Sequence, residues 1–110
     1  MTISTNELRE NRKHLIDQLT AFDGKILRGS VIESYRKCGK PRCKCVAGTG
    51  HGPKYSMTVN FPKRKPENVY ITLEYVTQVK EFVSKYHQCK EIIEQICMIN
   101  LELLKRRDEL

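Results

Sequence analysis

The spacing of apolar residues changes twice along the chain, which separates a helical segment, a strand-forming segment and a second helical segment. Over residues 4–23, large apolar residues recur at spacings of seven, four and three and form one stripe, which predicts an amphipathic helix. Ser4 and Glu7 fit a capping box, in which the hydroxyl accepts from the amide three residues later. Gly24 tolerates the left-handed backbone that ends a helix. We therefore expect the first helix to end near residue 23.

The middle of the chain has a period of two. Residues 55–61 and 69–73 alternate apolar and polar side chains, which predicts two strands joined by the Pro-flanked basic loop at 62–68. Residues 26–37 are expected to supply a third strand. The alternation places Tyr55, Met57, Val59 and Phe61 toward a core. The opposite face would carry the polar residues Ser56, Thr58, Asn60 and Tyr70.

Residues 74–107 show a 4-3 alternation of apolar positions over five heptads, which is coiled-coil spacing. This long helix is predicted to cover the sheet and to run antiparallel to the first helix. It exceeds that helix by about 21 Å at the helical rise. The excess would meet another chain or stay exposed. We predict a homodimer through seam residues Ile93, Ile96, Asn100 and Leu103, because a polar seam residue fixes register. The alternative is that the seam only packs within its own domain.

Together these segments predict one α+β domain over residues 1–110. It contains a helix at 4–23, a basic β region at 25–73 with a Cys/His loop at 38–53, and a long helix at 74–107. The sheet is expected to be three-stranded and antiparallel, and the two helices to pack like a coiled coil. A chain of 110 residues has room for only one such core.

Composition predicts where the protein is located and where its positive charge is concentrated. No apolar run approaches the ~20 residues of a membrane span, and the first ten residues carry Glu7, Arg9 and Glu10 where a secretory signal is apolar. We therefore expect a cytoplasmic protein. Residues 25–65 hold eleven Lys and Arg and a single acid, a local charge of +10 against +7 for the whole chain. Such a concentration indicates a surface that binds polyanions, although a solvated basic loop is the simpler alternative.

Three cysteines and a histidine lie within fourteen residues, in the pattern C-x4-C-x-C-x5-H. These are Cys38, Cys43, Cys45 and His51. Cys₃His is a known structural zinc set, and the neighbouring cations would lower the thiol pKa values. Two alternatives stay open: an unmetallated turn held by Gly and Pro, and a redox or nucleophilic thiol. We take zinc as the prediction, because four ligands of the right types occur together. Cys89 and Cys97 are predicted to be small core residues.

At this motif the chain resembles an uncharacterised family of small bacterial and archaeal domains. The resemblance rests on Gly29-Ser30-Val31, Cys38-Gly39-Lys40-Pro41, Cys43, Cys45 and His51-Gly52-Pro53, and covers about residues 29–86. Members often occur in or beside transposases and recombinases of mobile elements, which implies DNA rather than RNA as partner. Members often carry several aromatic residues after His-Gly-Pro, whereas this chain keeps only Tyr55.

The sequence therefore predicts a DNA-binding accessory protein of a mobile element. Lysines would hold phosphates while polar residues read base edges. Few aromatic residues argue against a single-strand stacking platform. The predicted contact residues are Arg36, Lys37, Lys40, Arg42, Lys44, Lys54, Asn60, Lys63, Arg64 and Lys65.

The sequence is also consistent with two other functions. One is a zinc-stabilised adaptor that recruits a recombinase or another partner through the long helix. The other is an enzyme with a thiolate nucleophile. We expect no enzyme, because His14 and His87 lie in helical segments without a catalytic motif around them.

Overall fold

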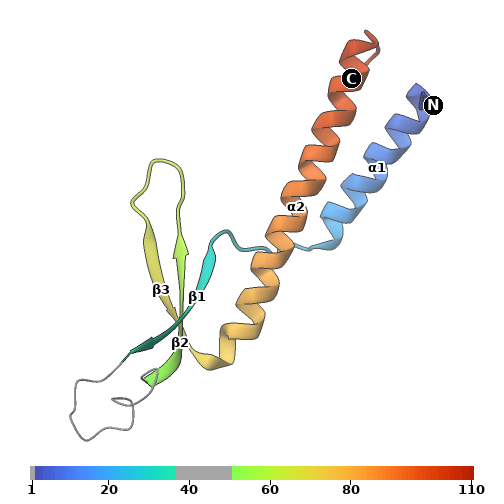
Figure 1. Ribbon diagram of the computed structural model, residues 1–110. Helices are drawn as coiled ribbons and strands as arrows, with labels where there is room; N and C mark the ends of the chain where they lie inside the picture. Colours follow the sequence, from blue (N-terminus) through green and yellow to red (C-terminus); the bar gives the residue numbers. More distant parts are fainter. Residues whose placement is uncertain (1, 37–50) are drawn as a thin grey trace, which may run out of the picture. The chain divides into compact units, whose positions relative to one another are not determined.

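The structure is a computed structural model that describes residues 2–36 and 51–110. The elements follow in the order α1 (Thr5–Ala21), β1 (Ser30–Arg36), β2 (His51–Val59), β3 (Glu67–Ile71) and α2 (Leu73–Lys105) (Figure 1). This is the predicted α+β class, with a three-stranded antiparallel sheet and a long C-terminal helix. The chain divides into a helical unit, Met1–Ile26 with Ser84–Leu110, and a sheet unit, Leu27–Val83. The single domain over residues 1–110 stays a prediction.

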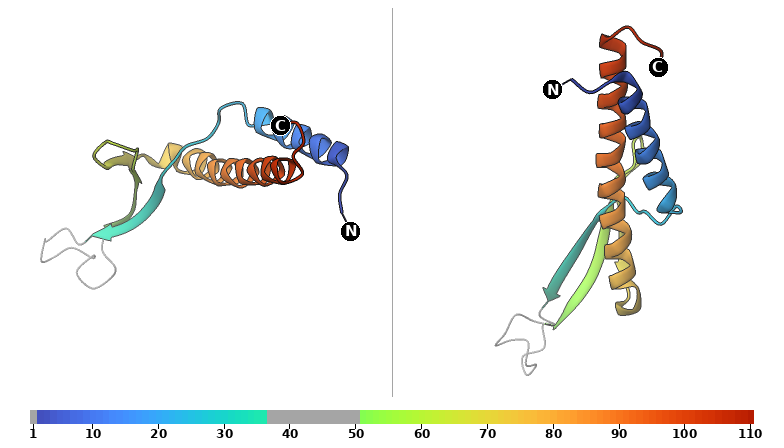
Figure 2. Two further views of the ribbon diagram at one scale, coloured as in Figure 1. Left: turned by 90° about the horizontal axis from the view of Figure 1, so that it is seen from above. Right: turned by 90° about the vertical axis from the view of Figure 1, so that its right-hand side faces the viewer.

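The helical unit pairs α1 with the second half of α2 in antiparallel orientation, as predicted (Figure 2). At one end, the Thr5 hydroxyl donates to the Asp108 carboxylate at 3.2 Å. At the other end, Phe22 and Lys85 line the same surface hollow. The buried apolar residues of this unit are Leu8, Cys89, Ile92 and Leu103. Removing these side chains from water stabilises the pair.

The ends of α1 follow from local chemistry. The Ser4 hydroxyl accepts from the Glu7 amide at 3.2 Å, which confirms the predicted N-cap. After α1 ends at Ala21, Asp23 and Gly24 adopt left-handed backbone with φ of 53° and 73°. Because a right-handed helix cannot continue through such residues, the chain leaves α1 at this point.

The sheet unit places β2 between β1 and β3. Ser56 pairs with Ile32 on one side and with Tyr70 on the other, and the β1–β2 register shifts at a bulge between Ser34 and Arg36. Met57 and Val59 of β2 form a buried cluster with Ile71 of β3 and Val76 of α2. The first part of α2 therefore covers one face of the sheet, as the apolar spacing predicts.

This packing changes the interpretation of the long helix. The segment by which α2 exceeds α1 was expected to meet another chain or stay exposed. Instead, Val76, Val79 and Val83 of that segment pack against the sheet core. One helix thus supplies the cover for the sheet and the partner for α1, because its apolar stripe continues through both halves.

Three residues differ from their predicted positions. Phe61 is 46% exposed rather than in the core, because β2 ends at Val59. Leu73 is exposed because it begins α2 instead of ending a strand. Cys97 is exposed while Cys89 is buried; eight residues turn a helix by about 80° beyond two full turns, which carries Cys97 away from the buried side of α2.

Within residues 2–36 and 51–110, neither helix is long and apolar enough to cross a membrane.

Candidate functional site

The face of the sheet that α2 does not cover is the candidate site, and we call it the outer face. Strand residues alternate between faces, so the neighbours of buried Met57 point to the opposite side. The backbone register extends this face across all three strands. It comprises Ser30, Ile32 and Ser34 of β1, Lys54, Ser56 and Thr58 of β2, and Asn68 and Tyr70 of β3. None of these eight residues is acidic, and most carry a hydroxyl or an amide.

A shallow hollow of about 290 Å³ lies on this face. Its lining combines Tyr70 and Tyr55 with Ser34, Ser56, Asn68 and Lys54. The Ser34 hydroxyl donates to the Lys54 carbonyl at 3.4 Å, and Tyr70 is 65% exposed. The hollow therefore offers an aromatic ring, hydrogen-bonding groups and one cation to a ligand.

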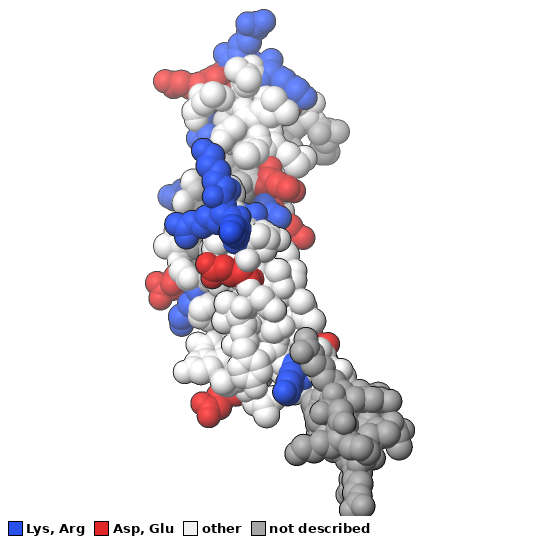
Figure 3. Space-filling view, turned by 90° about the vertical axis from the view of Figure 1, so that its left-hand side faces the viewer, with Lys and Arg blue, Asp and Glu red and all other residues white. Residues whose placement is uncertain are grey.

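A basic turn, Lys63-Arg64-Lys65, joins β2 to β3. All three residues are exposed. Lys63 has a left-handed backbone with φ of 63°, and the Arg64 amide donates to the Phe61 carbonyl at 3.2 Å. Seen toward the sheet, Lys and Arg side chains gather at the height of this turn, beside a largely uncharged surface (Figure 3). The turn thus concentrates positive charge at one end of the outer face.

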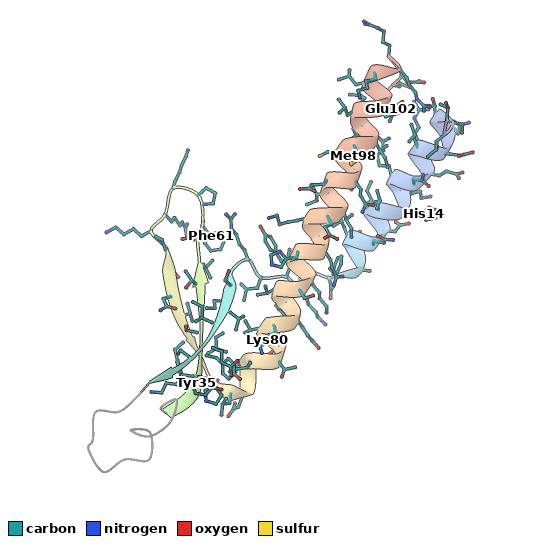
Figure 4. All side chains as sticks on the ribbon, in the orientation of Figure 1. His14, Tyr35, Phe61, Lys80, Met98 and Glu102 are labelled. Atoms are coloured by element: carbon teal, nitrogen blue, oxygen red, sulfur yellow. The ribbon has the colours of Figure 1, made fainter. Side chains whose placement is uncertain are left out.

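Two further cations of the sheet unit lie over aromatic rings. The Arg28 guanidinium is 5.9 Å from the centre of the Phe61 ring, next to the turn, and the Lys80 ammonium is 5.3 Å from the Tyr55 ring. Phe61, in the connection between β2 and β3, and Lys80, on the first part of α2, are labelled in Figure 4. Such contacts hold a cation near a neutral partner, so its charge is not cancelled.

Charge is used differently in the two units. Among the described residues, the ion pairs are Arg9–Asp108 at 3.3 Å and Arg106–Glu102 at 3.0 Å, both in the helical unit. No described basic side chain of the sheet unit is in an ion pair. The described cations of the sheet unit are therefore available to an external anion.

Tyr35, near the end of β1, is already engaged. Its hydroxyl donates to the Glu33 carboxylate at 3.0 Å. This hydrogen bond, followed by desolvation and the charge of Glu33, raises the pKa of Tyr35 above 10.0. The phenol is therefore neutral at physiological pH, and its proton is used in the hydrogen bond to Glu33.

Comparison with known proteins places the chain in a family. The family model described as "Domain of unknown function (DUF6788)" matches residues 5–81. The chain belongs to this family. No curated protein and no solved structure matches it. The DUF6788 match confirms an uncharacterised domain family, and it extends further toward the N-terminus than the resemblance predicted from residues 29–86.

The DUF6788 match includes the segment predicted to bind zinc. Cys38, Cys43 and Cys45 lie outside the described residues, as do the predicted contacts Lys37, Lys40, Arg42 and Lys44. His51 and Arg36 are described by their backbone alone, where they are partners across β1 and β2. In the part of the chain that the structure describes, no three His, Cys, Asp or Glu residues group as metal ligands.

The remaining predicted contact residues all lie at the surface. Lys54 belongs to the outer face, while Asn60 follows the end of β2 and precedes the basic turn. The structure therefore brings Asn60 together with Lys63, Arg64 and Lys65, while Lys54 lies within β2, apart from this group. Sequence reasoning missed Ser34 and Asn68. The two-residue spacing of Ser30, Ile32 and Ser34 was the signal that could have placed β1 on the same face.

The predicted dimer residues have different environments. Ile93 is 50% exposed and Ile96 half-buried, whereas Leu103 is fully buried in the helical unit. The Asn100 amide oxygen accepts from the Arg12 guanidinium at 2.7 Å. The dimer itself stays a prediction.

Another set of apolar side chains on α2 is at least half exposed, and sequence reasoning selected only Ile93 of it as a dimer residue. It comprises Met98, Leu101 and Leu104 together with Ile93. Ile93, Leu101 and Leu104 fall within about 80° on one helical face, which the exposed Cys97 shares. We call Ile93, Cys97, Leu101 and Leu104, which share this face, the α2 stripe. It lies beyond the DUF6788 match.

Proposed function

We propose that this DUF6788 protein binds nucleic acid, and specifically DNA, through its outer face and basic turn. The observation that carries the proposal is the set of exposed cations on an acid-free strand face and in the turn beyond it. Lys54 lies within β2, about 17 Å from its end at Val59 at the rise of a strand, and the basic turn follows beyond that end. A polyanion lying along β2 would meet Lys54 and the basic turn, with hydrogen-bonding groups between them.

The role of accessory protein of a mobile element is supported by the sequence resemblance. It predicts that the protein protects the ends of such an element from nuclease more strongly than unrelated DNA of equal length. Equal protection of both would contradict this part of the proposal.

Zinc is proposed for Cys38, Cys43, Cys45 and His51. The support is the donor set, because thiolates and imidazole are the ligands that tetrahedral Zn²⁺ prefers. Bound there, zinc would cross-link the segment before β2. Mass spectrometry of protein purified without added zinc is expected to show one zinc per chain, and Cys43→Ser should lose it. Equal metal content in both would exclude this ligand set.

The DNA-binding proposal is tested by the salt dependence of affinity. Each phosphate that a cation neutralises contributes about 0.9 to the slope of log K against log salt. Replacing Lys63, Arg64 and Lys65 together by Ala should therefore flatten the slope by about three units. The matched control replaces the exposed Lys13, Lys90 and Lys105, which removes the same charge from the helical unit. An unchanged slope in the turn variant would remove the turn from the interface.

A second candidate, a protein-interaction adaptor, is favoured by the α2 stripe. Exposed apolar side chains on a helix suit association with another helix. We place the proposed homodimer here. In an antiparallel pair centred between Cys97 and Leu101, Glu94 of one copy would lie near Lys105 of the other, which adds charge complementarity. A recombinase partner is proposed for the same stripe.

Sedimentation separates these possibilities. Leu101→Glu with Leu104→Glu should convert a dimer to a monomer without changing DNA affinity. If instead a partner recruited through this stripe survives high salt and nuclease, and DNA is not bound at physiological salt, the adaptor becomes the function. A wild-type chain that is already monomeric would overturn the homodimer.

A further inference from the structure

Tyr70 is the most exposed of the large apolar and aromatic side chains on the sheet. It is 65% exposed on the edge strand β3 of the outer face, in register with Ser56 of the central strand. The other aromatic residues of the sheet unit that border the strands have partners: Tyr35 donates to Glu33, Phe61 lies under Arg28, and Tyr55 lies under Lys80. Between described residues, no recorded hydrogen bond or ring contact involves Tyr70. Its ring is thus free to meet a ligand.

The surroundings of Tyr70 suit a planar, polar ligand. Ser34, Ser56 and Asn68 line the same hollow, and an amide and hydroxyls can both donate and accept hydrogen bonds. Lys54 adds a cation at its edge. A volume of about 290 Å³ is at the lower limit of small-ligand sites, which suits one ring system rather than an extended molecule.

These features together describe a nucleobase attached to a phosphate. Bases stack on exposed aromatic rings, their edges need donors and acceptors, and the backbone needs a cation. A base paired inside a duplex has both faces covered by its neighbours, so it cannot stack on Tyr70. A single aromatic ring takes only one unpaired base, so the few aromatic residues of the sequence argue against a platform for several bases but not against this contact.

We propose that Tyr70 stacks one unpaired base, with Ser56 and Asn68 at the base edge and Lys54 at the adjoining phosphate. The chain would then prefer single-stranded or locally opened DNA to closed duplex. This inference rests on the proposed DNA-binding function and specifies the form of its substrate.

Affinity for two DNA probes tests the proposal. The probes are a single strand of about 15 nucleotides, within the range of small single-strand sites, and the same sequence as a closed duplex. Tyr70→Ala should weaken single-strand binding about tenfold or more, the usual loss when one stacked base is released, and change duplex binding less than about twofold. Tyr70→Phe keeps the ring and should retain single-strand affinity. Tyr75→Ala removes a tyrosine of α2 that is 57% exposed and should have no effect.

A direct readout is available because the chain contains no tryptophan. Tyr70→Trp places a sole indole in the site, and the single strand should quench its fluorescence. Tyr75→Trp is the matched control and should not be quenched. Quenching at residue 70 alone, with the affinity pattern above, supports the proposal.

Three outcomes would overturn it. If Tyr70→Ala binds both probes as the wild-type chain does, while the basic-turn variant loses affinity, the DNA-binding proposal is supported and the proposal that Tyr70 stacks a base is wrong. Equal losses for single strand and duplex would show that Tyr70 does not select an unpaired base. If the wild-type chain binds neither probe, the proposed function fails and the stacking proposal fails with it.

Discussion

The helical unit pairs some of its cations with its own acids, whereas the described cations of the sheet unit form no ion pair. In the helical unit, arginines join the ends of the chain: Arg9 binds Asp108, Arg12 donates to the Leu110 carbonyl at 2.8 Å, and Arg106 donates to the Thr5 hydroxyl at 3.4 Å. In the sheet unit, the described cations lie over aromatic rings or extend into solvent. The difference shows that net charge alone does not indicate a binding surface. Cations that already have partners stabilise the fold, and only the others can attract a polyanion.

The largest expected effect is on the stability of the helical unit. Leu103→Ala removes a side chain with no exposed surface, so the free energy of unfolding should fall by about 2–5 kcal/mol, as for other buried leucines. Urea denaturation measures this. The neighbouring Leu104 is 59% exposed, and Leu104→Ala should cost far less. DNA affinity of the still-folded Leu103→Ala protein should be unchanged, because the proposed DNA contacts lie in the sheet unit. A parallel loss of affinity would mean that the helical unit also contributes to binding.

In the sheet unit, Gly29→Ala should destabilise by about 1–3 kcal/mol. Gly29 has φ of 148°, and an added Cβ would lie 2.9 Å from the Thr58 carbonyl oxygen and 2.6 Å from the end of Met57. Met57 can move, but the backbone oxygen of a paired strand cannot. Gly24→Ala is the control, since its φ is 73° but nothing lies within 4 Å of an added Cβ. If both variants lose equal stability, backbone conformation rather than the close approach to Thr58 explains the effect.

Arg12→Ala should cost about 1–2 kcal/mol, because it leaves the half-buried Asn100 amide oxygen without its donor. A double-mutant cycle with Asn100→Ala measures the coupling. Coupling near zero would show that the 2.7 Å contact does not stabilise the protein. Asn100 also distinguishes two roles. If it sets register between two copies, its replacement changes the oligomeric state, whereas a role within one chain changes stability alone.

The smallest expected effect is at low pH. The Glu109 amide, the Thr5 hydroxyl and Arg9 lower the pKa of Asp108 below its ordinary 3.8. A carboxylate with a lowered pKa stabilises the folded state fully above 3.8, and this contribution is lost as pH falls through the lowered value. The difference in urea midpoint between wild type and Asp108→Asn should therefore shrink below pH 4. Because Asp108 is exposed, the difference is small at every pH, and a constant difference would contradict the assignment.

Short-range patterns predicted most of the fold. The Ser4 cap, the alternation through Met57 and Val59, and the long apolar stripe of α2 are all set by spacing within one element, which the sequence contains directly. The elements therefore came out in the right order and of the right type.

What the sequence could not specify is which neighbour each face meets. The same 4-3 spacing serves the sheet through Val76, helix α1 through Leu103 and a predicted second copy through Ile93. Periodicity shows which positions lie on one helical face but not which element covers that face. From the sequence, Asn100 is therefore predicted to lie in a seam between chains, whereas its partner within the chain is Arg12. The candidate site was partly predictable for the same reason: alternation identified Ser56 and Tyr70, whereas Asn68 and Ser34 needed the register between strands.

The connection between β2 and β3 has a consequence for how such a protein can evolve. Every residue from Asn60 to Pro66 is exposed, and none belongs to the buried cluster beneath the sheet. Its sequence can therefore be lengthened, shortened or recharged while the strands keep their partners. Relatives with acidic or neutral residues in this connection would keep the same fold and bind different molecules. Substitution of a few residues would then be enough to gain or lose the proposed electrostatic attraction for DNA.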